Sequence, residues 1–171
     1  MRYPSCAIPV EIPFLDAILS ARFPRVRAAV AAFALALALP AAAQNTAPAK
    51  PLPVASVKVA GHALKVEVVS TPEQRSRGLM FREKMGRNDG MLFIFDEPGY
   101  HAMWMMNTLI PLSVAFLDGE GRILNVEDMQ PKTLESHAAQ GPARYAIETN
   151  IGWFAERRIK AGDKVTGLPK P

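Results

Sequence analysis

The sequence predicts a mostly β domain, a compact antiparallel β-sandwich or barrel-like fold with one or two short helices, preceded by a signal peptide. About seven short runs suited to strands are separated by turn signals, a pattern typical of β-sandwiches and barrels. The connections between these runs are too short for the crossovers that a parallel doubly wound sheet needs. The expected strands are residues 54–60, 63–69, 91–95, 101–107, 112–117, 122–128, 143–149 and 164–166.

Turn and capping residues set the order of these elements. Gly61 and His62 separate the first two strands and predict an antiparallel hairpin, and residues 118–121 predict a second one. The apolar run 91–95 is typical of a strand buried on both faces, and residues 96–99 are expected to turn the chain after it.

Two short helices are expected. Thr71 is suited to cap a helix whose first residue is Pro72 and which runs to about Met80. Asn150 is expected to cap a second helix over residues 151–158.

Residues 1–43 have the pattern of a secretory signal peptide. Three arginines at 22, 25 and 27 precede an uncharged apolar stretch, residues 28–39, and small residues follow before Gln44. The stretch is shorter than the roughly 20 apolar residues that span a bilayer, so no stable membrane insertion is expected after cleavage near Ala43–Gln44. We therefore expect a periplasmic or secreted protein. A buried alanine-rich helix is the structural alternative, and the prolines within residues 1–21 indicate a start assigned too far upstream.

The remainder divides into a Pro/Ala linker, residues 44–53, expected to be disordered, and a single domain, residues 54–171. The chain carries 20 basic and 16 acidic residues, and four of the former and two of the latter lie in the signal peptide, so cleavage lowers the net charge from +4 to +2. This weakens any nucleic-acid interpretation. The single cysteine, Cys6, excludes an internal disulfide, and we expect a monomer without a cofactor.

Methionine and histidine gather in the expected strand 101–107. His101, Met103 and Met105 would line one face of that strand, because alternate side chains of a strand share a face. Imidazole and thioether ligands suit Cu(I), which makes copper handling a minor alternative. Methionine also fills irregular apolar cores, and core packing is the preferred interpretation.

A second group of residues suits a ligand site. Arg77 and Arg82 could bind an anion through their guanidinium groups, and Trp104, Asn107 and Thr108 lie at the end of an expected strand. These five residues are the predicted groove of a binding module for an unknown small molecule or envelope component. The structural alternative is that the arginines bind backbone carbonyls or face solvent, and that Asn107 and Thr108 satisfy a turn.

Evidence for catalysis is weak. No nucleophile elbow, phosphate-binding loop or zinc motif occurs, and the three histidines, His62, His101 and His137, are expected in solvated positions without metal-ligand spacing. The alternative function is an envelope hydrolase that acts on a glycan with carboxylates such as Asp96 or Asp118.

Several ordered motifs carry a family resemblance. They read RGLMFR at residues 77–82, GMLFIF at 90–95, MWMMNTLIPL at 103–112 and AFLD at 115–118. With further matches at residues 144–165, the chain resembles the family numbered 192 among domains of unknown function. The resemblance implies a compact β-sandwich, often exported in bacteria and present in archaea, with no established activity. Met106 and Ser113 stand where the family usually has Lys and often Asp, which argues against ionic catalysis in this segment.

Overall fold

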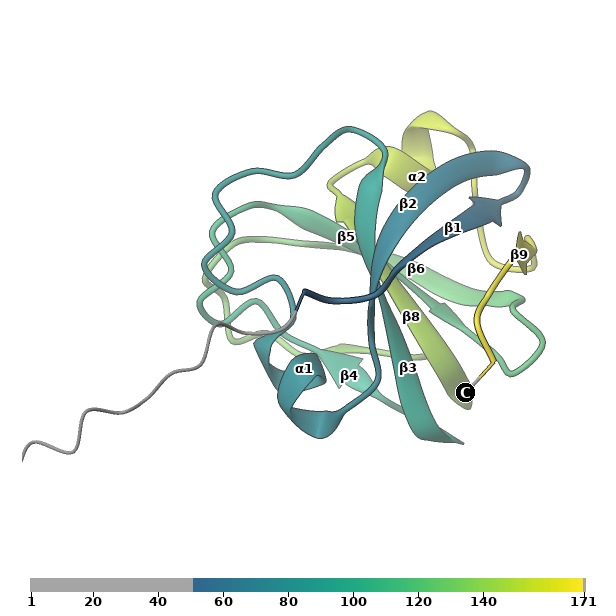
Figure 1. The fold of residues 1–171 in the computed structure, drawn as a ribbon, viewed down its shortest axis with the longest axis horizontal. Helices are drawn as coiled ribbons and strands as arrows, with labels where there is room; N and C mark the ends of the chain where they lie inside the picture. Colours follow the sequence, from purple (N-terminus) through teal and green to yellow (C-terminus); the bar gives the residue numbers. More distant parts are fainter. Residues whose placement is uncertain (1–50, 171) are drawn as a thin grey trace, which may run out of the picture. The chain divides into compact units, whose positions relative to one another are not determined.

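The computed structural model describes residues 51–170, and the predicted signal peptide lies outside them. Its elements are β1 (Val54–Val59), β2 (His62–Val69), α1 (Pro72–Arg77), β3 (Asp89–Gly99), β4 (Ala102–Met103), β5 (Leu112–Leu117), β6 (Ile123–Met129), β7 (His137–Ala138), β8 (Ala143–Asn150), α2 (Trp153–Glu156) and β9 (Val165–Thr166) (Figure 1). The mostly β fold with two short helices is confirmed.

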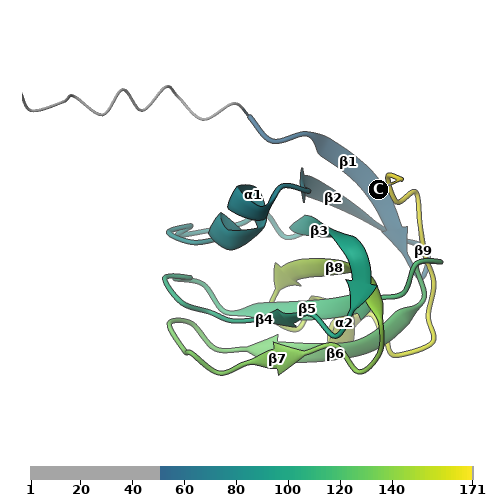
Figure 2. The same ribbon diagram turned by 90° about the horizontal axis from the view of Figure 1, so that it is seen from below.

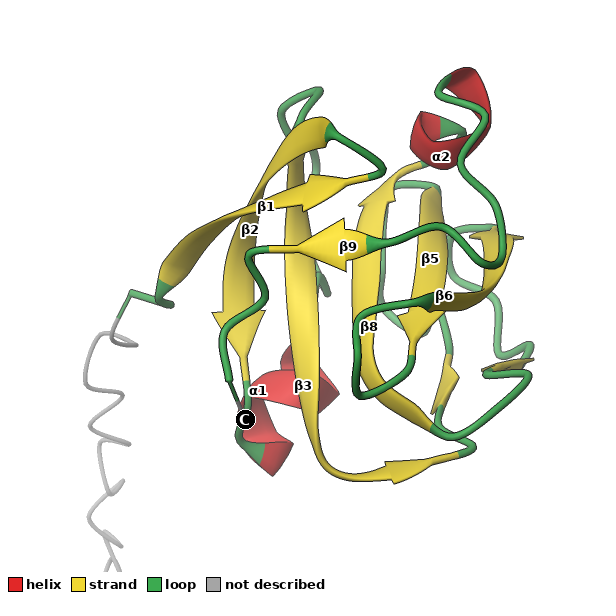
Figure 3. Ribbon diagram, turned by 90° about the vertical axis from the view of Figure 1, so that its right-hand side faces the viewer, coloured by secondary structure: helices red, strands yellow, loops and turns green. Residues whose placement is uncertain are grey.

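One curled sheet forms the body of this domain. Its strand order is β6-β5-β8-β3-β2-β1-β9, and β4 and β7 form a separate two-stranded ribbon. The two edges of the large sheet meet at one corner. There Arg122 and Lys164 form an isolated antiparallel β-bridge, and the Ile123 N–H donates to the Asp163 carbonyl at 2.9 Å. The sheet is therefore a half-barrel, which Figure 3 shows with β9 crossing in front of β3 and β8.

The central strands β3, β5 and β8 are buried on both faces. Leu92, Ala115 and Ile147 belong to one apolar cluster, whereas Phe93, Val114 and Ala146 belong to a second cluster on the opposite face. Because side chains alternate along a strand, each of these strands contributes to both clusters. The expectation that residues 91–95 are buried on both faces is confirmed.

Helix α1 begins as the sequence predicts and ends earlier. The Thr71 hydroxyl accepts a hydrogen bond from the Gln74 N–H, and the Gln74 side chain accepts from the Thr71 N–H, both at 3.3 Å. The helix ends at Arg77, followed by Gly78 with φ of 44°. α1 connects β2 to β3, which pair in parallel, so the sheet is not purely antiparallel. The segment between these strands, 70–88, is long enough for such a crossover although its helix has only six residues.

Three further local expectations were wrong. The predicted strand 101–107 shrinks to β4, and the chain turns at Met106 and Asn107, so His101, Met103 and Met105 do not line one strand face. Residues 96–99, expected to form a turn, are instead the end of β3. The register between β3 and β8 shifts between Ile94 and Gly99. Helix α2 starts after Gly152, in the left-handed conformation, and has no side-chain cap.

Of the predicted linker, only residues 51–53 are described. The Pro53 carbonyl accepts a hydrogen bond from the Val68 N–H at 2.8 Å, and Leu52 packs against the second apolar cluster. These residues are part of the domain.

Close packing of β3 against β8 generates a first prediction. A Cβ at Gly90 would lie 2.5 Å from the backbone carbonyl oxygen of Glu148, an atom that is held within the sheet. We expect Gly90→Ala to lower the free energy of unfolding by about 1–3 kcal/mol, the usual cost of overpacking. Gly119→Ala is the matched control, since a Cβ there meets no atom within 4 Å. Urea unfolding of both variants tests this, and equal midpoints would contradict it.

Candidate functional site

A cavity of about 490 Å³ opens between α1, the end of β3 and the segment around β4. Its volume lies in the range of small-molecule sites. Figure 2 shows α1 and the loops that follow α1, β4 and β6 on one side of the domain. The walls are largely apolar and are formed by Leu79, Met80, Phe93, Phe95, Met103 and Trp104.

Glu148 lies at the base of this cavity. It is in the middle of β8, opposite Met91 on β3 and Val114 on β5, and both of these neighbours are fully buried. Burial raises the pKa of the Glu148 carboxyl from 4.5 to about 8, because no nearby cation or hydrogen-bond donor offsets the loss of hydration. At neutral pH the group is therefore predominantly a neutral acid, able to donate a hydrogen bond to a molecule in the cavity.

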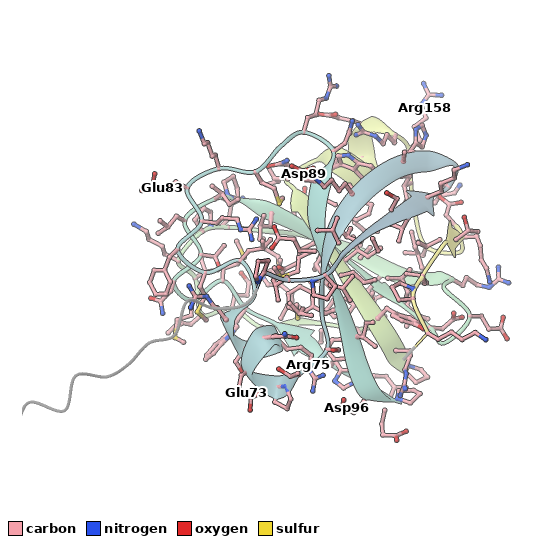
Figure 4. All side chains as sticks on the ribbon, in the orientation of Figure 1. Glu73, Arg75, Glu83, Asp89, Asp96 and Arg158 are labelled. Carbon is pink, nitrogen blue, oxygen red and sulfur yellow. The ribbon has the colours of Figure 1, made fainter. Side chains whose placement is uncertain are left out.

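The α1 side of the cavity carries two arginines in different states. Arg75 is fixed, since its guanidinium donates to Asp96 at 2.7 Å, to the Ile94 carbonyl at 3.0 Å and to the Ser70 carbonyl. The hydrogen bond from Arg75 to Asp96 lowers the pKa of the Asp96 carboxyl, which favours its ionised form. Figure 4 shows Arg75 and Asp96 at this end of the domain, whereas Arg158 lies at the opposite end.

Arg77, unlike Arg75, has a guanidinium group that is available to a ligand in the cavity. It is exposed, lines the cavity, and forms no ion pair within residues 51–170. Trp104, which is 51% exposed, also lines the cavity, and the buried Thr108 adds a hydroxyl to its wall. Three of the five predicted site residues are thus brought together.

The other two predicted residues lie outside the cavity wall. Arg82 forms a two-point ion pair with Glu67, with both N–O distances at 2.7 Å, and this interaction raises the pKa of Arg82. Asn107 acts through its backbone. It has φ of 58°, which asparagine tolerates better than most residues, and its carbonyl accepts from the N–H of Phe81, itself at φ of 63°. This bond ties the loop after α1 to the loop after β4.

Of the carboxylates and histidines named from the sequence, Asp96 and His101 line the cavity, whereas Asp118 and His137 lie elsewhere. Asp118 lies in the β5–β6 hairpin, where its carboxylate accepts from the N–H groups of Glu120 and Arg122. His101 stacks on Phe95 with ring centroids 3.7 Å apart and lines the cavity. His137 is not in a solvated loop as expected: it lies on β7 and is buried against Glu127.

Glu148 is the residue that the sequence analysis missed. The signal was present, because the strand ARYAIET places Glu148 on the same face as Ala146, within a run expected to be a strand. What the sequence does not reveal is that both faces of this strand are covered.

Within residues 51–170, no group of three or more His, Cys, Asp or Glu side chains could hold a metal ion. In the same range, no helix is long and apolar enough to cross a membrane.

The described residues form a half-barrel domain with a cavity beside α1. Comparison with known proteins identifies the family of this domain. Residues 55–167 match the model of DUF192, described as "Uncharacterized ACR". The chain belongs to this family. No curated protein matches the chain.

Two solved structures share the fold. A putative transcription regulator from Sinorhizobium meliloti 1021 has 32% sequence identity and a TM-score of 0.67, over 69% of this chain and 96% of that one. A protein of unknown function from Novosphingobium aromaticivorans DSM 12444 has 34% identity and a TM-score of 0.66, over 70% and 89%. These likenesses support the mostly β fold.

The buried carboxyl generates a prediction about pH. Because Glu148 holds its proton up to about pH 8 when folded and releases it near pH 4.5 when unfolded, the free energy of unfolding should fall as pH rises between these values. The slope should approach about 1.4 kcal/mol per pH unit. Glu148→Gln should remove this contribution. The free energy of unfolding of the variant, relative to that of the unmodified chain, should therefore rise from pH 5 to pH 8.

Urea unfolding at several pH values measures the effect, with Glu83→Gln at an exposed position as the matched control. Parallel pH profiles for the unmodified chain and Glu148→Gln would contradict the prediction.

Proposed function

We propose that this protein is a non-enzymatic binding module of the cell envelope that takes a small organic ligand into the cavity beside α1. The observation that carries the proposal is the combination at one cavity of an unpaired cation, an exposed indole and a buried neutral acid, Arg77, Trp104 and Glu148. Export is proposed from residues 1–43, whose pattern is that of a signal peptide. The mature domain is proposed to act as a monomer.

The side chains suggest the ligand's chemistry. Apolar walls suit a hydrocarbon or aromatic body, and Trp104 offers a flat surface for stacking. Arg77 at the opening suits a carboxylate, sulfonate or phosphate group. Glu148 and Thr108, deeper in the cavity, suit hydrogen-bonding groups on the ligand's buried end. We therefore propose an amphipathic organic anion.

Nucleic acid is not part of this proposal. The mature chain has a net charge of only +2, and its one unpaired cation at the cavity is too little for the phosphate contacts that dominate such binding.

The fluorescent probe 1-anilinonaphthalene-8-sulfonate tests the binding proposal, since it joins an aromatic body to one sulfonate. We expect saturable binding to the folded, exported chain, with affinity lowered roughly five- to thirtyfold in Trp104→Ala and in Arg77→Ala, the effect of losing about 1–2 kcal/mol each. Arg87→Ala is the matched control, because Arg87 is exposed and faces Glu156 of α2.

Unfolding midpoints of all variants check that the domain remains folded. Probe binding that is absent, or that is the same in all three variants, would contradict the proposed site.

A glycan hydrolase is the second candidate, and one observation favours it. Glu148, with its raised pKa, and Asp96, with its lowered pKa, line the same cavity. Two carboxyl groups whose pKa values are pushed apart are the pattern of an acid paired with an ionised carboxylate in glycoside hydrolysis. Asp96 is held by Arg75, however, and is mostly exposed, which is why binding is preferred.

Release of reducing ends from purified peptidoglycan tests the hydrolase. Turnover that is lost in Glu148→Gln and retained in Asp118→Asn, at the hairpin, would favour catalysis. Turnover that is absent, or unchanged in Glu148→Gln, would rule out this role for Glu148.

A further inference from the structure

His137 is a buried histidine with only one of its ring nitrogens satisfied. The residue is 6% exposed on β7, and its Nδ1 lies 3.0 Å from an oxygen of the Glu127 carboxylate. Its Nε2 is buried and has no hydrogen-bond partner among the described residues. A buried imidazole nitrogen without a partner costs free energy unless something binds it.

The contact with Glu127 orients this imidazole. Where Nδ1 donates to the Glu127 carboxylate and the ring carries a single proton, Nε2 presents a lone pair that a metal ion can take. The other oxygen of Glu127 accepts from the Asn125 amide at 3.0 Å, and that amide also donates to the Ala138 carbonyl at 3.0 Å. The carboxylate is thus held in place, in the arrangement that orients metal-binding histidines through their second nitrogen.

Met103 carries a thioether on the same face of the β4–β7 ribbon as the His137 side chain. Met103 is the direct partner of His137 in the antiparallel β4–β7 ribbon. Side chains of directly opposed residues project from the same face of such a pair, with Cβ atoms about 4.5–5.5 Å apart. Met103 packs against the second apolar cluster and also lines the cavity.

We propose that His137 Nε2 and the Met103 thioether form a binding site for a single Cu(I) ion. Thioether sulfur is a soft ligand that selects Cu(I) over harder divalent ions. Cu(I) is also satisfied by two or three ligands, so it does not need the larger set of His, Cys and carboxylate groups that residues 51–170 lack.

This site replaces the copper site expected from sequence. His101 instead stacks its ring on Phe95, and its Nε2 lies 2.9 Å from the Glu97 carbonyl. The histidine comes instead from a strand more than thirty residues further along the chain. The copper site shares Met103 with the wall of the ligand cavity, whereas Arg77 and Glu148 take no part in it.

Anaerobic titration of the exported chain with Cu(I), against the chromophoric competitor bicinchoninate, tests the site. We expect one equivalent bound with a dissociation constant well below micromolar. Met103→Leu, which keeps the volume of the side chain, and His137→Gln should each weaken binding at least tenfold. Met106→Leu and His62→Gln are matched controls at a turn and at the exposed start of β2, and should leave it unchanged.

Unfolding midpoints accompany each titration, and Met103→Leu retains the test if His137→Gln fails to fold. X-ray absorption of the loaded protein should show both nitrogen and sulfur ligands. Binding weaker than micromolar, binding retained in both variants, or preference for Zn²⁺ over Cu(I) would each overturn the proposal.

Discussion

Burial of the central sheet on both faces is the constraint on which this structure depends. Strands β3, β5 and β8 lie between two apolar clusters, so a polar side chain on either face loses its hydration. Glu148 occupies such a position between Met91 and Val114 and responds by holding its proton. A charged carboxylate there would cost far more free energy than the neutral acid. Glu148 also lines the cavity beside α1.

Helix α1 and the loops after α1 and β4, which lie beside the cavity, are held in place by specific hydrogen bonds. Arg75 joins α1 to the end of β3 through Asp96 and the Ile94 carbonyl. The backbone bond between Phe81 and Asn107, both in the left-handed region, joins the next two loops. Within residues 51–170 Arg77 forms no ion pair, and Trp104 is 51% exposed, which is why the ligand proposal rests on them. Strained backbone next to a cavity is a frequent companion of binding sites.

Local signals in the sequence were sufficient for much of the fold. The β1–β2 and β5–β6 hairpins and the capping box at Thr71 depend on residues close together in the chain, and all three were predicted. The parallel pairing of β2 with β3 was missed because the connections between the expected strands were judged too short for a crossover. The pairing of β4 with β7 was missed because the residues of β7 have the local signals of a loop. For the same reason His137 was expected in solvent. Trp104, Thr108 and Arg77, grouped from the sequence, line the same cavity, whereas Glu148 required knowledge of what covers β8.

The protonation state of Glu148 is the central claim, and carbon NMR measures it directly. The chain, labelled with carbon-13 at the glutamate carboxyl groups, would be titrated from pH 4 to pH 9, with Glu148→Gln assigning the resonance. The account predicts that the Glu148 carboxyl titrates with a midpoint near pH 8. A midpoint near 4.5, the ordinary value for glutamate, would contradict it and would show that water or a cation reaches the base of the cavity.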